Sequence, residues 1–289
     1  FAVYFVQFFA LSRGYGLSMA FLFGAFYYCM TLYQSSSSRN LALGLVFSVL
    51  AVLANMSLLP LVLLLAIVMK VMVLINFKSY NTLKSYLWTV PSILIWLAGM
   101  YVAVKISFKM KDEGSLYYGE LDGFWDVTVK SQLLMLFEND SFIPQFLTFL
   151  VILIVLWVCI KLIFSQKLNS VFNRNLFFFF LLVGSIVGIE LMAIILKVNY
   201  PEDRVGMYLI PLFIGALCFG VEDLKSKNAK YFLIPLLVFP VHFLSTLNLE
   251  KSSLWQVEFI PERFYSEIKN NSTDSVYPSS VGGDGQRIF

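Results

Sequence analysis

Charged residues are scarce in this chain. Of its 289 residues only 13% are Asp, Glu, Lys or Arg, whereas 59% are hydrophobic. A soluble domain carries about 25% charged residues, and a disordered chain combines low hydrophobicity with high charge, so both classes are excluded. The formal net charge is only +3 and no run of Lys and Arg forms a stripe, which argues against a nucleic-acid-binding protein. The composition indicates an α-helical membrane protein that crosses the bilayer several times.

Cysteine and histidine are also rare. Cys29, Cys159 and Cys218 each lie inside an apolar stretch, whereas disulfide frameworks occupy exposed loops and zinc sites pair cysteines at short spacing. We therefore interpret all three as small buried hydrophobic side chains. His242 is the only histidine and has no histidine partner for a metal site. Its default interpretation is a hydrogen-bonded residue in the wall of the helical bundle, and the alternative is a substrate contact.

Apolar segments occupy most of the chain. A spanning helix needs about 20 mostly apolar residues, which predicts an all-α polytopic bundle of about nine spanning segments, the first of them short. The segments are 1–11, 15–33, 41–55, 58–76, 86–105, 145–164, 176–197, 206–221 and 231–247. Phe1 opens the chain inside such a segment, without the charged start of a signal peptide. We therefore expect the sequence to be a fragment that lacks its true N-terminus.

Two domains are predicted, a transmembrane bundle over residues 1–247 and an extracytoplasmic segment over 248–289, whose end also reads as cut short. Within the bundle, segments 41–55 and 58–76 are separated by little more than Asn55, Met56 and Ser57, which predicts a tight helical hairpin. Pro60 falls in the first turn of the second helix, where proline is tolerated.

Orientation follows from the basic loops. The short loops 34–40, 77–85, 165–175 and 221–230 are basic and contain few acids, which predicts that they face the cytoplasm. Arg13, the Asn55 turn, the 106–144 loop and the 248–289 tail then share the outer face. Within the long loop, the apolar spacing of residues 127–137 suits an amphipathic helix at the membrane interface.

Ionisable residues near apolar segments are functional candidates, because burying a charge in a membrane is costly. Arg13 lies beside Gly14, Tyr15 and Gly16, and it either snorkels to the interface or contacts an anion at the mouth of a cavity. Glu190 lies inside an apolar segment, with Lys197 too far along the chain for an ordinary direct pair. It is either a protonated, hydrogen-bonded structural residue or part of a substrate site.

The strongest feature is the outer loop VNYPEDRV at residues 198–205. Glu202 and Asp203 are expected near the positive N-terminal end of the helix that follows, so helix capping with an interfacial ion pair is one interpretation. The other is a binding site, because the planar guanidinium of Arg204 suits phosphate. Tyr200 lies in the same loop. Two arginines and several acids on one face suit an amphiphile that carries a phosphate.

These residues resemble the central part of the GT-C-fold integral-membrane glycosyltransferases. The resemblance covers most of residues 1–247 through short motifs, namely SRGYGLSMAFLFGAFYYCMTLY, the hairpin ALGLVFSVLAVLANMSLLPLVLLL, and Arg13/Tyr15 with Pro201/Arg204/Pro211 at matching places. The family includes dolichyl-phosphate-mannose-type transferases and bacterial polyprenyl-phosphate-sugar transferases.

The resemblance implies an enzyme of the cell envelope, multi-pass in a bacterial inner (plasma) membrane. It would move a hexose or pentose from a polyprenyl-phosphate donor to a lipid, glycan or protein acceptor on the non-cytoplasmic face. The family's catalytic acid lies in an early outer loop. We expect this sequence to begin after that loop, so no catalytic residue is carried over.

Only Arg13 and Arg204 are carried over, as contacts to the donor phosphate. Glu202 and Asp203 could bind sugar hydroxyls or a divalent cation, or could position Arg204. No cofactor is required by the sequence. The remaining substrate-binding candidates are Tyr15, Glu190, Tyr200 and His242.

Three other classes compete with this interpretation. A polysaccharide polymerase or ligase also uses arginines and a large outer loop. A transporter of lipid-linked sugars would have polar residues near the bilayer midplane, whereas the charges here lie near one face. A membrane scaffold would not need arginine and acids in the short 198–205 loop.

Overall fold

A computed structural model describes residues 14–35, 37–75, 83–113, 120–137, 142–165 and 174–222, together with 231, 234, 237 and 241. The chain divides into two units, Phe1–Thr246 and Leu247–Phe289, and every described residue belongs to the first. Arg13, His242 and the segment 248–289 lie outside the described residues, as do residues 1–11 and most of 231–247.

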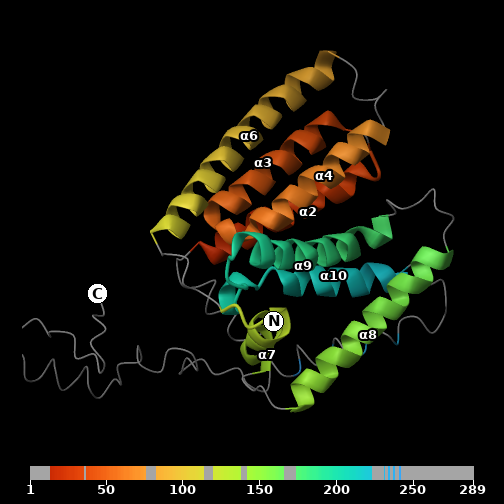
Figure 1. The fold of residues 1–289 in the computed structure, drawn as a ribbon. Helices are drawn as coiled ribbons and strands as arrows, with labels where there is room; N and C mark the ends of the chain where they lie inside the picture. The colour runs from red at the N-terminus through yellow and green to blue at the C-terminus, as the bar shows by residue number, and fades with distance from the viewer. Residues whose placement is uncertain are drawn as a thin grey trace, which may run out of the picture. The chain divides into compact units, whose positions relative to one another are not determined.

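The described part of the chain contains helices and connecting turns and no β-strand. Figure 1 shows the helices, coloured from red near the N-terminus to blue toward the C-terminus. The longer ones are α2 (Tyr15–Leu32), α3 (Ser38–Ala54), α4 (Leu59–Ile75), α6 (Leu83–Asp112), α7 (Lys130–Phe137), α8 (Phe142–Ser165), α9 (Phe177–Leu196) and α10 (Leu209–Glu222). Short turns precede four of them: η1 (Met56–Leu58), the π-helical η2 (Phe124–Val129), η4 (Arg174–Leu176) and η5 (Asp203–Val205).

Four helical segments among the described residues are long and apolar enough to cross a membrane. They are Tyr15–Leu32, Met56–Leu74, Ser85–Asp112 and Phe177–Leu196. The prediction of an all-helical membrane protein is therefore confirmed, whereas about nine spans are not. The predicted segments 41–55 and 206–221 correspond to α3, with 17 residues, and α10, with 14, which are shorter than the usual length of a spanning helix.

The α3–α4 connection is a tight turn at the predicted position. Asn55 ends α3 with an extended backbone, φ −150° and ψ 107°, and its side-chain Oδ1 accepts a hydrogen bond of 3.2 Å from the Ser57 backbone N–H. This contact caps η1, because an asparagine oxygen can satisfy a donor that the start of a helix leaves open. Pro60 lies in the first turn of α4, where a missing N–H costs little.

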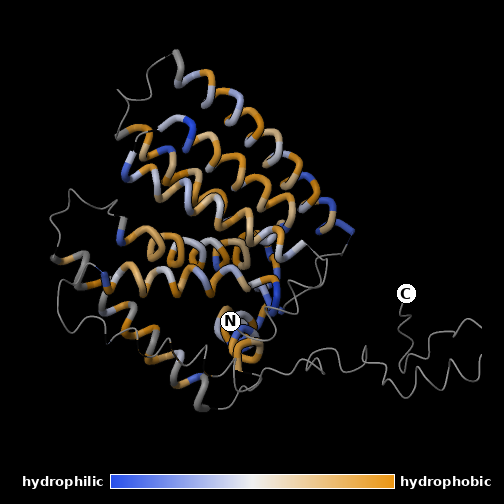
Figure 2. Tube along the Cα trace, turned by 180° about the vertical axis from the view of Figure 1, so that it is seen from behind, coloured by the Kyte–Doolittle hydropathy of each residue, from blue (hydrophilic) through white to orange (hydrophobic). Residues whose placement is uncertain are grey.

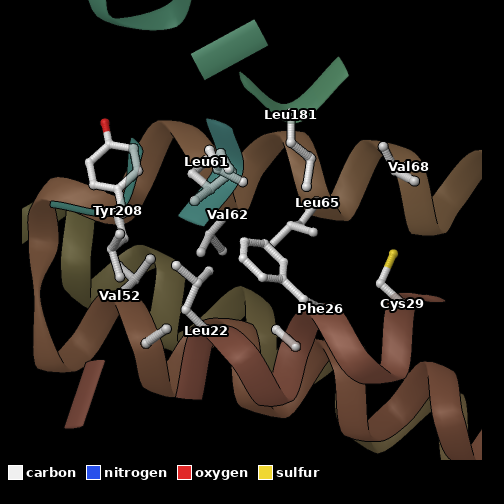
Figure 3. Packing of buried hydrophobic residues seen from close by; sticks show 14 of the residues in the cluster. Leu22, Phe26, Cys29, Val52, Leu61, Val62, Leu65, Val68, Leu181 and Tyr208 are labelled. Atoms are coloured by element: carbon white, nitrogen blue, oxygen red, sulfur yellow. The ribbon is translucent and has the colours of Figure 1, made fainter. Parts of the chain in front are cut away.

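The core forms where α2, α3, α4 and α9 meet (Figure 3). Leu22, Leu61 and Leu65 are fully buried, and the Phe26 ring packs edge-on against Phe178 with ring centroids 5.3 Å apart. Such packing stabilises a membrane bundle through dispersion, because lipid tails are as apolar as the side chains themselves. Cys29 is buried in this core, as the interpretation of the cysteines requires, and Cys218 is half-buried.

Helix α6 packs on one side only. It contacts α3, and Gly99 makes this approach close, because a Cβ built there would lie 2.3 Å from Val49 Cγ2. Away from that contact, Leu87, Leu94 and Tyr101 are 71%, 61% and 68% exposed. Figure 2 shows apolar residues along most of the helices and hydrophilic ones mainly near helix ends and in connections. Exposed apolar side chains of this kind suit contact with lipid.

Candidate functional site

The candidate site is built around the connection between α9 and α10. Helix α9 ends at Leu196, and Lys197 leaves it in the left-handed region with φ 53°. The Lys111 ammonium, at the end of α6, donates a hydrogen bond of 2.7 Å to the Leu196 carbonyl. A cation at this place satisfies a carbonyl that the helix end leaves open and complements the negative end of the helix dipole.

The start of α10 corrects one expectation. Glu202 and Asp203 were placed near the N-terminal end of the helix that follows the loop, but α10 begins only at Leu209. The short turn η5 and residues 206–208 intervene. Glu202 precedes η5 and makes no side-chain capping hydrogen bond. The side chain of Glu202 therefore does not cap the turn that follows it.

Other segments converge on this loop. The Ser57 hydroxyl, in the α3–α4 turn, lies 3.2 Å from the Val205 carbonyl and 2.8 Å from Asn55 Oδ1, and its single proton can serve either acceptor. The Tyr200 N–H donates to the Glu120 carbonyl at 3.0 Å. The loop, the Asn55 turn and the segment after α6 thus meet at one end of the bundle, as the common outer face predicts. Which side of the membrane this end faces stays a prediction.

Arg204 reaches the start of α2. Its guanidinium carbon lies 5.9 Å from the centre of the Tyr15 ring, within the range of a cation–π contact. Gly14 precedes Tyr15 with φ 80°, and a Cβ there would lie 2.9 Å from the Ala54 carbonyl oxygen. Only glycine combines this backbone with so close an approach, and it sets Tyr15 beside the end of α3. The structure therefore brings together two predicted site residues, Tyr15 and Arg204.

A second predicted pair is joined directly. The Tyr200 hydroxyl donates a hydrogen bond of 2.9 Å to Glu190 Oε2, and Tyr200 is only 7% exposed. This hydrogen bond to the carboxylate raises the pKa of the Tyr200 phenol, because a phenol that donates to a carboxylate holds its proton more firmly. Glu190 thus has a hydrogen-bond partner within the protein, and whether it also contacts a substrate stays a prediction.

Acids gather beside the loop. The pKa of Glu120 is raised, first by its hydrogen bond to Asp122, then by the charge of Asp122 and by that of Glu202. The pKa of Asp203 is also raised, because the surrounding protein partly removes its carboxyl from water, while neighbouring Arg204 works in the opposite direction. Within the described residues no group of three or more His, Cys, Asp or Glu side chains is arranged to hold a metal ion.

Sequence reasoning missed the residues that hold the loop in place. Ser131 Oγ accepts a hydrogen bond of 2.9 Å from the Asp203 N–H, and the Gln132 side-chain amide donates to the Asp203 carbonyl. Both lie in the stretch predicted as an amphipathic helix over 127–137, which the structure forms as the end of η2 followed by α7. In the sequence, the only indication of this contact is that Ser131 and Gln132 are polar residues within that amphipathic stretch. Whether this helix lies at a membrane interface stays a prediction.

Comparison of the chain with protein-family models, with curated proteins and with solved structures finds no match in any of the three. The comparisons identify neither a family nor an activity, so the glycosyltransferase interpretation has no support from them.

Proposed function

We propose that the protein is a membrane glycosyltransferase that moves a sugar from a polyprenyl-phosphate donor to a lipid, glycan or protein acceptor. The observation that carries the proposal is the position of Arg204. It lies in the connection between two apolar helices, against Tyr15 at the start of a third. A planar guanidinium can bind two phosphate oxygens at once.

The chemistry needs charge stabilisation where the glycosyl–phosphate bond breaks. The departing phosphate gains negative charge in the transition state, and a fixed cation close to it lowers the barrier. Arg204 would supply that cation, with Arg13 as a second one, while Glu202 and Asp203 would bind sugar hydroxyls or position Arg204. A carboxylate must also take the proton from the acceptor hydroxyl, and none of the described residues is assigned this role.

We also propose how the protein is oriented in the membrane. The end of the bundle that carries Arg204 would face the non-cytoplasmic side of a bacterial plasma membrane, with about nine spans in all. The basic character of the short loops 34–40, 77–85, 165–175 and 221–230, which we expect at the opposite end, supports this orientation. Arg39 marks that opposite end, since α3 begins at Ser38 and reaches the Asn55 turn at its other end.

Transfer from radiolabelled polyprenyl-phosphate hexoses and pentoses, in membranes from cells that produce the protein, tests the proposal. We expect Arg204→Lys to lower the transfer rate by about ten- to hundredfold, the equivalent of one hydrogen bond to a charged group. Lysine keeps the charge and loses the planar fork. Arg39→Lys, an exposed substitution at the other end of α3, is the matched control and should transfer normally.

Two outcomes would contradict the proposal. One is normal transfer by Arg204→Lys, which would reduce Arg204 to a structural contact of Tyr15. The other is the absence of transfer from every donor together with unchanged binding of polyprenyl phosphate by Arg204→Gln. The second result would leave no role for a lipid-linked phosphate at this end of the bundle.

A further inference from the structure

The residue before Arg204 is held at both of its backbone polar groups. The Asp203 N–H donates to Ser131 Oγ at 2.9 Å, and the Asp203 carbonyl accepts from the Gln132 side-chain amide. Ser131 and Gln132 are neighbours in the first turn of α7. One helix turn thus binds both the N–H and the carbonyl of Asp203. Asp203 lies 72 positions after Ser131 and 71 positions after Gln132 in the chain.

Asp203 has a backbone that needs such support. Its φ is 46°, in the left-handed region, which L-residues other than glycine adopt at a cost, although aspartate tolerates it better than most. The Asp203 carbonyl belongs to the peptide plane that leads into Arg204. A contact that fixes this carbonyl therefore also fixes the direction in which the Arg204 side chain leaves the backbone.

The fit around this contact is close. Gln132 and Ser131 are only 7% and 8% exposed. A Cβ at Gly206 would lie 2.8 Å from Gln132 Nε2, so a larger residue there would push the amide aside. On the following residue, the Val205 carbonyl lies within hydrogen-bonding distance of the Ser57 hydroxyl. The backbone around Arg204 thus has α7 on one side and the α3–α4 turn on the other.

We propose that Gln132 is a positioning residue for Arg204: its amide fixes the Asp203 carbonyl and so sets the guanidinium over the Tyr15 ring. Its further role, to present Arg204 to a phosphate, rests on the proposed function. The positioning itself does not. Methionine at position 132 would keep the length of the side chain and remove the amide donor, whereas asparagine would keep the amide and shorten its reach.

A spectroscopic test reads the position of Arg204 directly. With 3-fluorotyrosine in place of Tyr15, the fluorine resonance of the purified protein reports the cation beside the ring. We expect Arg204→Gln to shift this resonance, and Gln132→Met to shift it in the same direction. Leu134→Met, an identical new side chain on the exposed side of the same helix, should leave it unchanged. A mere loss of stability would lower the unfolding temperature without moving the resonance of the folded protein.

A binding test connects the position to phosphate. The probe is polyprenyl phosphate in phosphatidylcholine nanodiscs, with empty nanodiscs as the blank. We expect Arg204→Gln to weaken binding about ten- to hundredfold and Gln132→Met about two- to tenfold, as for the loss of a charged and of a neutral hydrogen bond. Leu134→Met should bind as the unaltered protein does.

The outcomes separate the two ideas. An unchanged resonance in Gln132→Met, where Arg204→Gln shifts it, would overturn the positioning role whatever the binding data show. An unchanged resonance in Arg204→Gln would overturn the Arg204–Tyr15 contact on which that role depends. A shifted resonance with undiminished phosphate binding in Arg204→Gln would overturn the proposed function and leave the positioning role intact. Should Gln132→Met fail to fold, Gln132→Asn gives the same comparison.

Discussion

The Tyr200 hydroxyl donates a hydrogen bond of 2.9 Å to the Glu190 carboxylate, which lies ten positions earlier in the chain. The bond ties the loop after α9 back to the last turns of that helix. Glu190 is the one acidic residue of α9, and an acid in such a segment is costly without a partner. A phenol from the adjoining loop provides that partner without any contribution from a ligand.

Tyr200→Phe should therefore destabilise the protein without disturbing the fold. The substitution keeps the buried ring and removes the donor, and a polar group left without its hydrogen-bond partner costs about 1–3 kcal/mol. Thermal unfolding in detergent measures the change. Tyr27→Phe is the matched control, since Tyr27 is 64% exposed and exposed substitutions usually stay within about 0.5 kcal/mol. Equal effects of the two substitutions would show that the Glu190 contact contributes nothing to stability.

The acids beside the loop predict a pH dependence of stability. Asp122 and Glu202 raise the pKa of Glu120, and partial burial raises that of Asp203. For a carboxyl whose pKa is higher in the folded state, the folded protein binds the proton more tightly than the unfolded chain. These groups therefore favour folding when the pH falls through their raised pKa values, and that contribution is lost as the pH rises through the same values.

The substitution Asp122→Asn isolates the contribution of Glu120 to this pH dependence of stability. Asparagine removes the neighbouring charge, so the pKa of Glu120 should return toward its ordinary value and the stabilisation on acidification should shrink. Unfolding temperatures measured from neutral pH down to the ordinary carboxyl range test this. The control is Glu113→Gln, which changes the net charge by the same amount as Asp122→Asn. Glu113 is an exposed residue that pairs with Lys109. If both variants follow the same pH profile, Asp122 has no particular influence on Glu120.

Much of the fold could be predicted, because spanning helices carry their signal in composition. Helix α6 shows the limit. The predicted segment ends at 105, whereas the helix continues to Asp112, since Lys105, Lys109 and Lys111 lower the apolar content and are nevertheless good helix formers. The start of α10 was placed three residues early for a related reason. Apolar residues 207 and 208 belong to the turn after η5 and not to the helix.

The candidate site could be predicted only in part. Tyr15, Tyr200 and Arg204 are conspicuous in the sequence because polar groups are scarce near apolar segments. Their partners are not, since the contacts of Arg204 with Tyr15 and of Gln132 with Asp203 join distant segments. No local pattern indicates which polar residue of an amphipathic helix will meet which loop. The left-handed backbone of Asp203 is also invisible without the tertiary contacts that hold it.

Close approach between helices gives a last prediction. Gly99 brings α6 against α3, and a Cβ there would lie 2.3 Å from Val49 Cγ2. Valine has essentially one side-chain conformation in a helix, so α6 would have to move. Overpacking of this kind costs about 1–3 kcal/mol, which the better helix propensity of alanine, about 1 kcal/mol, offsets only partly. Gly99→Ala should therefore lower the unfolding temperature.

Gly188→Ala is the matched substitution, because the nearest atom to its new Cβ would be Pro60 Cβ at 3.4 Å, an ordinary contact. Here the gain in helix propensity should prevail, so the unfolding temperature should stay equal or rise. Combining Gly99→Ala with Val49→Ala removes the clashing methyl group, and the double variant should lose less stability than the two single losses added together. Additive losses would mean that residues 49 and 99 do not touch, and the packing of α6 on α3 at this point would then have to be rejected.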